Sequence, residues 1–135
     1  MNILVIDGQG GRLGRSLVSE LKKAFPESEL SVVGTNDSAT ENMRREGADR
    51  AATGENAVVV ACRKADVILG PLGIAVADSL MGEISPVMAN AVASSPAYRV
   101  LIPMNLCDTY VAGISGNSTQ MIADAIARVK KLIQE

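Results

Sequence analysis

Short apolar runs alternate with segments of helical periodicity along the whole chain, and this alternation limits the fold more than any other feature. Runs typical of buried strands cover residues 2–6, 30–33, 49–52, 66–70, 98–102 and 109–114. Segments typical of amphipathic helices cover residues 11–25, 39–46, 57–65, 85–94 and a C-terminal stretch capped near Ser118. Such alternation builds right-handed βαβ units. We therefore expect one domain over residues 1–135, a three-layer α/β fold whose doubly wound parallel sheet has about six strands, ordered 3-2-1-4-5-6, with helices on both faces.

One of these helices is open to a second interpretation. Residues 58–60 are three consecutive valines, which would also suit a strand. Thr53 as an N-cap, together with the length between the flanking strands, favours a helix.

The composition limits the classes of partner. Of the 135 residues, 47% are hydrophobic, yet the aromatic residues are only Phe25, Tyr98 and Tyr110. An aliphatic core fits a buried parallel sheet. A net charge of −2 and so few aromatic rings argue against nucleic-acid binding.

Cysteine and histidine usage excludes further chemistry. The chain has no histidine, and Cys62 and Cys107 stand far apart, which argues against Cys/His zinc sites and histidine-dependent catalysis. We expect both cysteines to be apolar filling residues rather than a disulfide. The chain opens as a strand rather than a signal peptide, and no apolar run approaches the roughly 20 residues of a membrane span, so a cytoplasmic location is expected.

A glycine-rich turn joins the first strand to the first helix. Glycines stand at positions 8, 10, 11 and 14. Gly8 would permit the sharp turn, Gly10 or Gly11 would let a pyrophosphate approach the backbone, and Gly14 would let the helix pack closely on the sheet. We predict that this turn binds the phosphates of a nucleotide, through the residues Gly8, Gln9, Gly10, Gly11, Arg12, Leu13 and Gly14. The alternative is a purely structural turn.

The end of the second strand bears on the identity of the nucleotide. NAD binders commonly place an acidic residue there to hold the ribose hydroxyls. This chain has Thr35 and Asn36 at that place, and Arg12 lies in the glycine turn. The pattern slightly favours NADP(H) over NAD(H) as the cofactor, and NAD(H) stays open because Asp37 could reach back.

Two further segments are expected at the same edge of the sheet. Thr53 and Gly54 follow the third strand, and Gly70 and Pro71 follow the fourth, where a nicotinamide ring would lie. Their plain alternatives are a helix cap and a turn that ends a strand. Asp78 and Glu83 lie beyond them; a role in acid–base chemistry is conceivable, but solvated surface carboxylates are favoured.

The glycine turn resembles the NADP(H)-binding loop of dihydrodipicolinate reductase over residues 1–34, through Gly10-Gly11-Arg12-Leu13-Gly14. The histidine-bearing active site of such reductases has no counterpart here, so the resemblance implies a binding loop and not that activity. The whole chain resembles an uncharacterised bacterial Rossmann-like family (domain of unknown function 3842). The matching segments are residues 6–11, 34–36, 52–57, 70–74, 78–80, 82–84 and 102–105. This resemblance implies a Rossmann-like fold and no reaction.

Two functions remain open from the sequence. The first is a dinucleotide-binding module, and the second is a small oxidoreductase whose active site is completed by a second subunit. The apolar stretch 72–92 is a candidate homo-oligomer contact in either case. Four residues after Tyr98 and Tyr110 stand Ile102 and Ile114, so no Tyr-x-x-x-Lys pair is present and catalysis itself is undecided.

Overall fold

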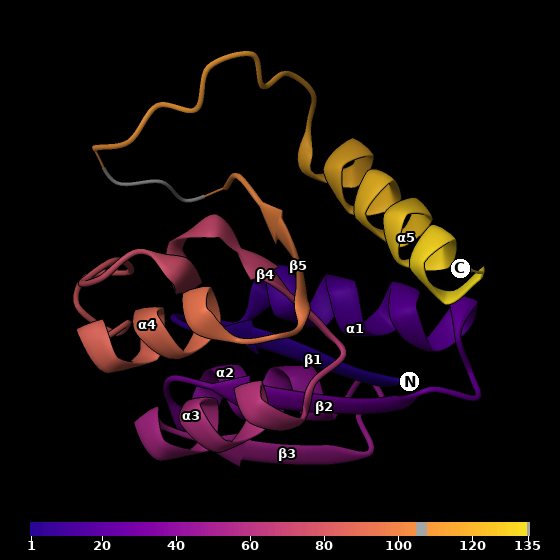
Figure 1. The fold of residues 1–135 in the computed structure, drawn as a ribbon, viewed down its shortest axis with the longest axis horizontal. Coiled ribbons are helices and arrows are strands. Elements are labelled where there is room, and N and C mark those ends of the chain that lie inside the picture. The colour runs from indigo at the N-terminus through magenta and orange to yellow at the C-terminus, as the bar shows by residue number, and fades with distance from the viewer. Residues whose placement is uncertain (105–107, 135) are drawn as a thin grey trace.

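A five-stranded parallel sheet forms the middle layer of the protein, with the strand order β3-β2-β1-β4-β5. The computed structural model describes residues 1–104 and 108–134 (Figure 1). The strands are β1 (Asn2–Asp7), β2 (Glu29–Gly34), β3 (Arg50–Thr53), β4 (Val67–Pro71) and β5 (Tyr98–Ile102). The predicted α/β class, the parallel sheet and the order of these five strands are confirmed.

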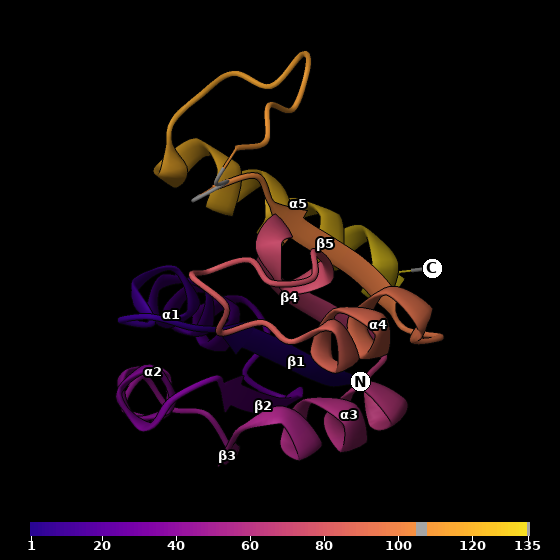
Figure 2. The ribbon, with the colours of Figure 1, turned by 90° about the vertical axis from the view of Figure 1, so that its left-hand side faces the viewer.

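Helices cover both faces of this sheet, because alternate residues of the central strand β1 point to opposite sides. Ile3 and Val5 pack with one apolar cluster, and Leu4 and Ile6 pack with the other. The first face carries α1 (Arg12–Ala24), α2 (Asp37–Arg44) and α5 (Ser118–Gln134); the second carries α3 (Glu55–Lys64), η1 (Leu72–Ala75) and α4 (Pro86–Ser94). Figure 2 shows α1 and α2 on one side of β1, with α3 and α4 on the other.

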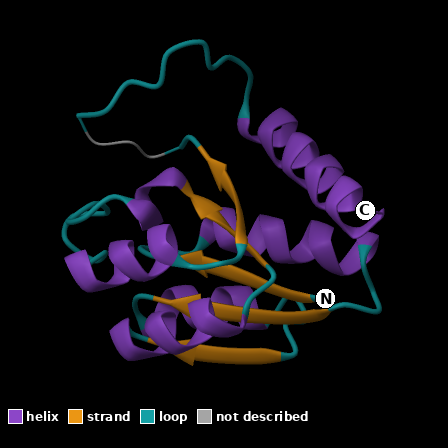
Figure 3. Ribbon diagram, viewed as in Figure 1, coloured by secondary structure: helices purple, strands orange, loops and turns teal. Residues whose placement is uncertain are grey.

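The segment predicted as a sixth strand is irregular. Residues 109–114 form turns and loop between β5 and α5 (Figure 3). Gly113 has a φ of 80°, which breaks an extended backbone, and the Tyr110 side chain is 88% exposed. The six-strand order is therefore wrong beyond β5 for the described residues.

Smaller corrections concern helix ends. The ambiguous segment lies in α3 up to Lys64, as favoured, and Ala65 is the C-cap; the N-cap is Gly54 and not Thr53, which belongs to β3.

Cys62 is buried and free, as expected, and burial raises the pKa of its thiol to about 11. Cys107, and Asn105 of the family resemblance, lie outside the described residues.

The register of the sheet sets the position of the site. Asp7 at the end of β1 pairs with Gly34 at the end of β2, so the two strands finish level. The loops after β1, β2 and β4 therefore meet at one edge, as the doubly wound topology requires. No helix among the described residues is long and apolar enough to cross a membrane.

Candidate functional site

The glycine turn is a tight reversal between β1 and α1. The Gly11 N–H donates to the Gly8 carbonyl at 2.9 Å, which closes a four-residue turn. Gln9 and Gly11 have φ angles of 50° and 69°, both in the left-handed region. Gly11 is the N-cap of α1, and the helix begins at Arg12. The predicted strand–glycine turn–helix unit is therefore present.

Asp7 fixes this turn from the inner side. Its carboxylate accepts the N–H of Gly8 at 2.8 Å and the N–H of Gly14 at 2.7 Å. The residue is 5% exposed, and burial raises its pKa although both hydrogen bonds act in the opposite direction. Sequence reasoning gave Asp7 no role. An aspartate directly between a buried strand and a glycine-rich turn was the available signal.

The glycines of the turn differ in what surrounds them. A Cβ on Gly11 would lie 2.8 Å from the Ala39 Cα, so Gly11 allows α2 to approach α1. A Cβ on Gly14 would collide with the Met43 side chain and lie 2.9 Å from the Asp7 Cβ. Gly10, in contrast, has no atom within 4 Å of its Cβ position and is exposed. Of the two glycines suggested for phosphate approach, Gly10 therefore remains open and Gly11 serves helix packing.

Glu83 meets the glycine turn from the outer side. One of its carboxylate oxygens, Oε1, accepts the Gln9 N–H at 2.7 Å, the Asn36 side-chain amide at 3.0 Å, and a short hydrogen bond from the Thr35 hydroxyl. Burial by itself would raise the pKa of Glu83, but these three hydrogen bonds outweigh it and leave the pKa lowered. The favoured interpretation of Glu83 as a solvated carboxylate is wrong. Asp78, in the same segment, is exposed.

Thr35 and Asn36 lie where the sequence placed them, at the end of β2 beside the glycine turn. The Asn36 amide donates to the Gln9 carbonyl at 2.9 Å, and its oxygen caps α2 by accepting the Ala39 N–H at 2.9 Å. Asp37 is exposed in the first turn of α2. The acid that meets the end of β2 is therefore Glu83, which is remote in sequence.

The other predicted segments share this edge of the sheet, and only the segment of Gly70 and Pro71 is closed; Thr53 is exposed, and a Cβ at Gly54 would meet no atom within 4 Å. The Gly54 N–H donates to the Gly34 carbonyl at 2.9 Å, and the Thr53 hydroxyl lies 2.7 Å from that of Thr40. Pro71 is buried, and a Cβ on Gly70 would collide with the Ile6 carbonyl. Gly70 therefore allows β4 to lie close to β1, and the contact with a nicotinamide ring stays a prediction.

Arginine side chains near the turn are of two kinds. Arg12 is exposed at the first position of α1. Arg44 and Arg45 pair with Glu41, at 2.5 Å and 3.4 Å between nitrogen and oxygen atoms. Arg44 and Arg45 therefore behave as an ordinary charged helix surface.

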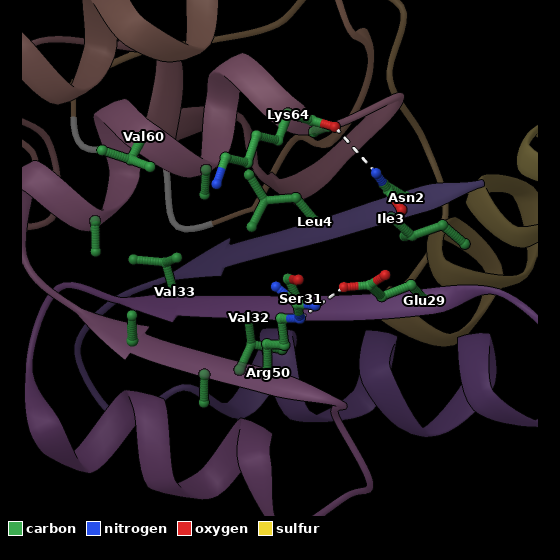
Figure 4. Close-up of a pocket in the computed structure, with 15 residues that line it drawn as sticks. Asn2, Ile3, Leu4, Glu29, Ser31, Val32, Val33, Arg50, Val60 and Lys64 are labelled. Atoms are coloured by element: carbon green, nitrogen blue, oxygen red, sulfur yellow. Dashed lines mark hydrogen bonds and ion pairs between the residues drawn. The ribbon is translucent and has the colours of Figure 1, made fainter.

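A groove of about 400 Å³ lies between α3 and the sheet, along β1, β2 and β3 from the start of these strands (Figure 4). Small side chains leave it open, because Ala51, Ala52, Ala57 and Ala61 line it. An ion pair between Arg50 and Glu29, at 2.8 Å, lies on its rim. The sequence gave no reason to place a site there.

The parallel sheet with its glycine turn at the carboxyl edge defines a Rossmann-like α/β domain. The chain belongs to the family described as a domain of unknown function, DUF3842, whose model matches residues 2–134. The resemblance to that family is thereby confirmed.

A solved structure, the dodecameric FMN-dependent Ubix-like decarboxylase from Escherichia coli O157:H7, is 16% identical, with a TM-score of 0.44. The alignment covers 98% of this chain and 94% of that one. No curated protein sequence matches the chain.

Proposed function

We propose that the protein is a dinucleotide-binding module whose glycine turn takes the phosphates, with NADP(H) slightly favoured over NAD(H). The observation that carries this proposal is the convergence of three donors, from Gln9, Thr35 and Asn36, on one anionic oxygen. Donors gathered in this way stabilise negative charge, as phosphate sites do. They lie beside the N-terminus of α1, whose backbone dipole also favours an anion.

The exposed part of the turn offers the entry point. Gly10 is open, and Arg12 is exposed two residues later, at the start of α1. Thr35 and Asn36 at the end of β2, near where a 2′-phosphate would be placed, are neutral residues and would not repel it. Arg12 would supply the positive charge for that phosphate, which is the reason for favouring NADP(H).

The test is calorimetric titration of the protein with NADP(H), NAD(H) and ADP. Gly10→Asp is the sharpest variant, because it adds a negative charge at a position where a Cβ would meet no atom within 4 Å. We expect wild type to bind a dinucleotide with micromolar affinity, Gly10→Asp to lose that binding, and the control Gly10→Ala to retain it. Gly11 is unsuitable because any side chain there disrupts the contact with Ala39. Absence of binding by wild type, or unchanged binding by Gly10→Asp, would remove the glycine turn from the proposal.

Arg12→Ala tests the preference between the two cofactors. Loss of a charge-assisted contact should weaken NADP(H) binding by roughly tenfold or more, with a much smaller effect on NAD(H). Arg15→Ala, which changes another exposed arginine of α1, is the matched control. Equal losses for the two dinucleotides would contradict the assignment of the 2′-phosphate.

A second candidate function, the small oxidoreductase completed by a second subunit, is favoured by exposed apolar side chains in residues 72–92. Val76, Met81 and Val87 are 41%, 90% and 50% exposed. A homo-oligomer that covers them would be seen by analytical ultracentrifugation, and a monomer at high protein concentration would exclude this candidate.

A further inference from the structure

We propose that Glu83 is a built-in occupant of the anion subsite, and that a phosphate-bearing nucleotide enters by displacing Glu83 together with the loop of residues 76–85. The inference rests on the proposed function, since it concerns the same donors. It adds a competition between the protein's own carboxylate and the incoming phosphate.

The geometry of Glu83 is that of an anion in a receptor site. A single oxygen accepts one backbone N–H, one hydroxyl and one side-chain amide, from Gln9, Thr35 and Asn36. These donors come from two separate loops, after β1 and after β2, and a phosphate oxygen would use the same three. Both anions cannot hold them at once.

The loop also covers the backbone that a ligand would approach. A Cβ at Gly8 would lie 2.8 Å from the Glu83 Oε1 and 3.0 Å from the Leu80 Cδ1. The side chain of Leu80 is 2% exposed, so it seals the space above Gly8. Gly10, two residues further along, remains open. A phosphate can therefore reach the outer part of the turn first, and must move the loop to reach the inner part.

The backbone of the loop is strained in the position that holds Glu83. Asp78, Leu80 and Met81 have φ angles of 65°, 55° and 57°, in the left-handed region that non-glycine residues rarely adopt. Such residues cost free energy that the surrounding contacts must supply. Here the contacts are the buried Leu80 and Ile84 and the hydrogen bond from the Asp78 N–H to the Ile84 carbonyl, at 2.7 Å. Opening the loop releases this strain, which lowers the cost of displacement.

The experiment compares ADP and NADP(H) binding by wild type, Glu83→Gln and Asp78→Asn, with a thermal melt to check that each is folded. Glu83→Gln keeps the shape of the side chain and removes its charge. We expect it to bind ADP and NADP(H) about tenfold or more tightly than wild type, because a neutral amide competes weakly for donors that prefer an anion. Asp78→Asn removes the same charge from an exposed position of the same loop, and Asn tolerates a left-handed φ. It should bind like wild type.

A second measurement uses wild type alone. Hydrogen–deuterium exchange of the amides in residues 76–85 should become faster when ADP or NADP(H) is added at saturation, because the loop leaves the turn.

The outcomes separate this proposal from the proposed function. Tighter binding by Glu83→Gln alone, with faster exchange in the loop, supports displacement. Binding that is equal in all three proteins, or weaker in Glu83→Gln, overturns displacement and leaves the dinucleotide site standing; the weaker case would mean that Glu83 holds the ligand. Equal gains in affinity by Glu83→Gln and Asp78→Asn would mean that only the net charge of the loop matters, and would also overturn displacement. If no protein binds either probe, both proposals fail together.

Discussion

Asp7 and Glu83 hold the glycine turn from its two sides, but the two carboxylates differ in burial, in their hydrogen-bond donors and in the direction of their pKa shifts. Asp7 is 5% exposed and binds two backbone N–H groups of its own turn and of α1. Glu83 is partly buried and binds donors from loops that lie far from it in the sequence. The pKa of Asp7 is raised by burial, whereas that of Glu83 is lowered by its hydrogen bonds.

This difference shows how one turn can be held rigidly on its inner side and still be accessible to a ligand on its outer side. The inner side is part of the core, where a lost hydrogen bond leaves a buried donor without a partner. The outer side is a surface where water or a ligand can replace the carboxylate. We expect the inner carboxylate to govern stability and the outer one to govern access to the turn.

The largest effect on stability should follow from Asp7→Asn. The amide keeps one acceptor oxygen but turns an N–H₂ group toward the second backbone donor, so either Gly8 or Gly14 loses its partner. We expect a loss of roughly 2–3 kcal/mol in the free energy of unfolding, measured by urea denaturation. A loss below that of Glu83→Gln would contradict the division into an inner and an outer side.

A smaller loss should follow from Glu83→Gln. The Gln9, Thr35 and Asn36 donors are close enough to the surface for water to replace the carboxylate, so we expect about 1 kcal/mol at neutral pH. Asp78→Asn, which removes an exposed charge of the same loop, should change the free energy of unfolding less. Equal losses would mean that the hydrogen bonds of Glu83 contribute nothing to folding.

The smallest expected effect is the pH dependence of the difference in free energy of unfolding between wild type and Glu83→Gln. Because the pKa of Glu83 lies below its ordinary value of 4.5, its contribution is present above pH 4.5 and is lost as the pH falls through the lowered value. The Glu83 charge is one cause of the raised pKa of Asp7, after burial, and a raised pKa at Asp7 favours the folded state at low pH instead. Burial is the largest cause of the Asp7 shift and is common to both proteins, so this part of the Asp7 contribution should cancel when wild type is compared with Glu83→Gln.

Urea denaturation of both proteins between neutral pH and pH 3 checks this expectation. The free energy of unfolding of wild type should exceed that of Glu83→Gln at neutral pH, and this excess should disappear toward pH 3. An advantage that persists there would mean that Glu83 stabilises the loop by packing rather than by its charge.

Much of the fold followed from the sequence, because it depends on local patterns. The alternating aliphatic residues of β1, the glycine turn after it and the amphipathic stripe of α1 each identify one element, and their order predicts the sheet. Residues 109–114 were predicted as a strand, although Gly113 and the exposure of the segment do not allow one. Periodicity alone does not show whether a short apolar run has a neighbour to pair with.

The arrangement of the candidate site depends, more than the fold does, on contacts between residues that are distant in the sequence. Thr35 and Asn36 were placed correctly because strands of a parallel sheet end at one edge. Glu83 was interpreted as a solvated carboxylate, because it contacts Gln9 across a separation of 74 residues and no periodic pattern encodes that approach. The sequence likewise could not distinguish the roles of Gly10 and Gly11, because only the packing of α2 against Gly11 and not against Gly10 separates them.

The sequence by itself determined the class of the domain and the existence of a glycine turn at the end of β1, since hydrophobic periodicity and glycine's backbone freedom act over a few residues. Only the tertiary structure decided what surrounds that turn. Asp7 is buried beneath it and Glu83 binds above it, because the sheet and the loop of residues 76–85 bring their carboxylates to different backbone amides of the same strand–turn–helix unit. Hydrogen bonds between residues far apart in the chain form only where the packed elements place their donors and acceptors within reach.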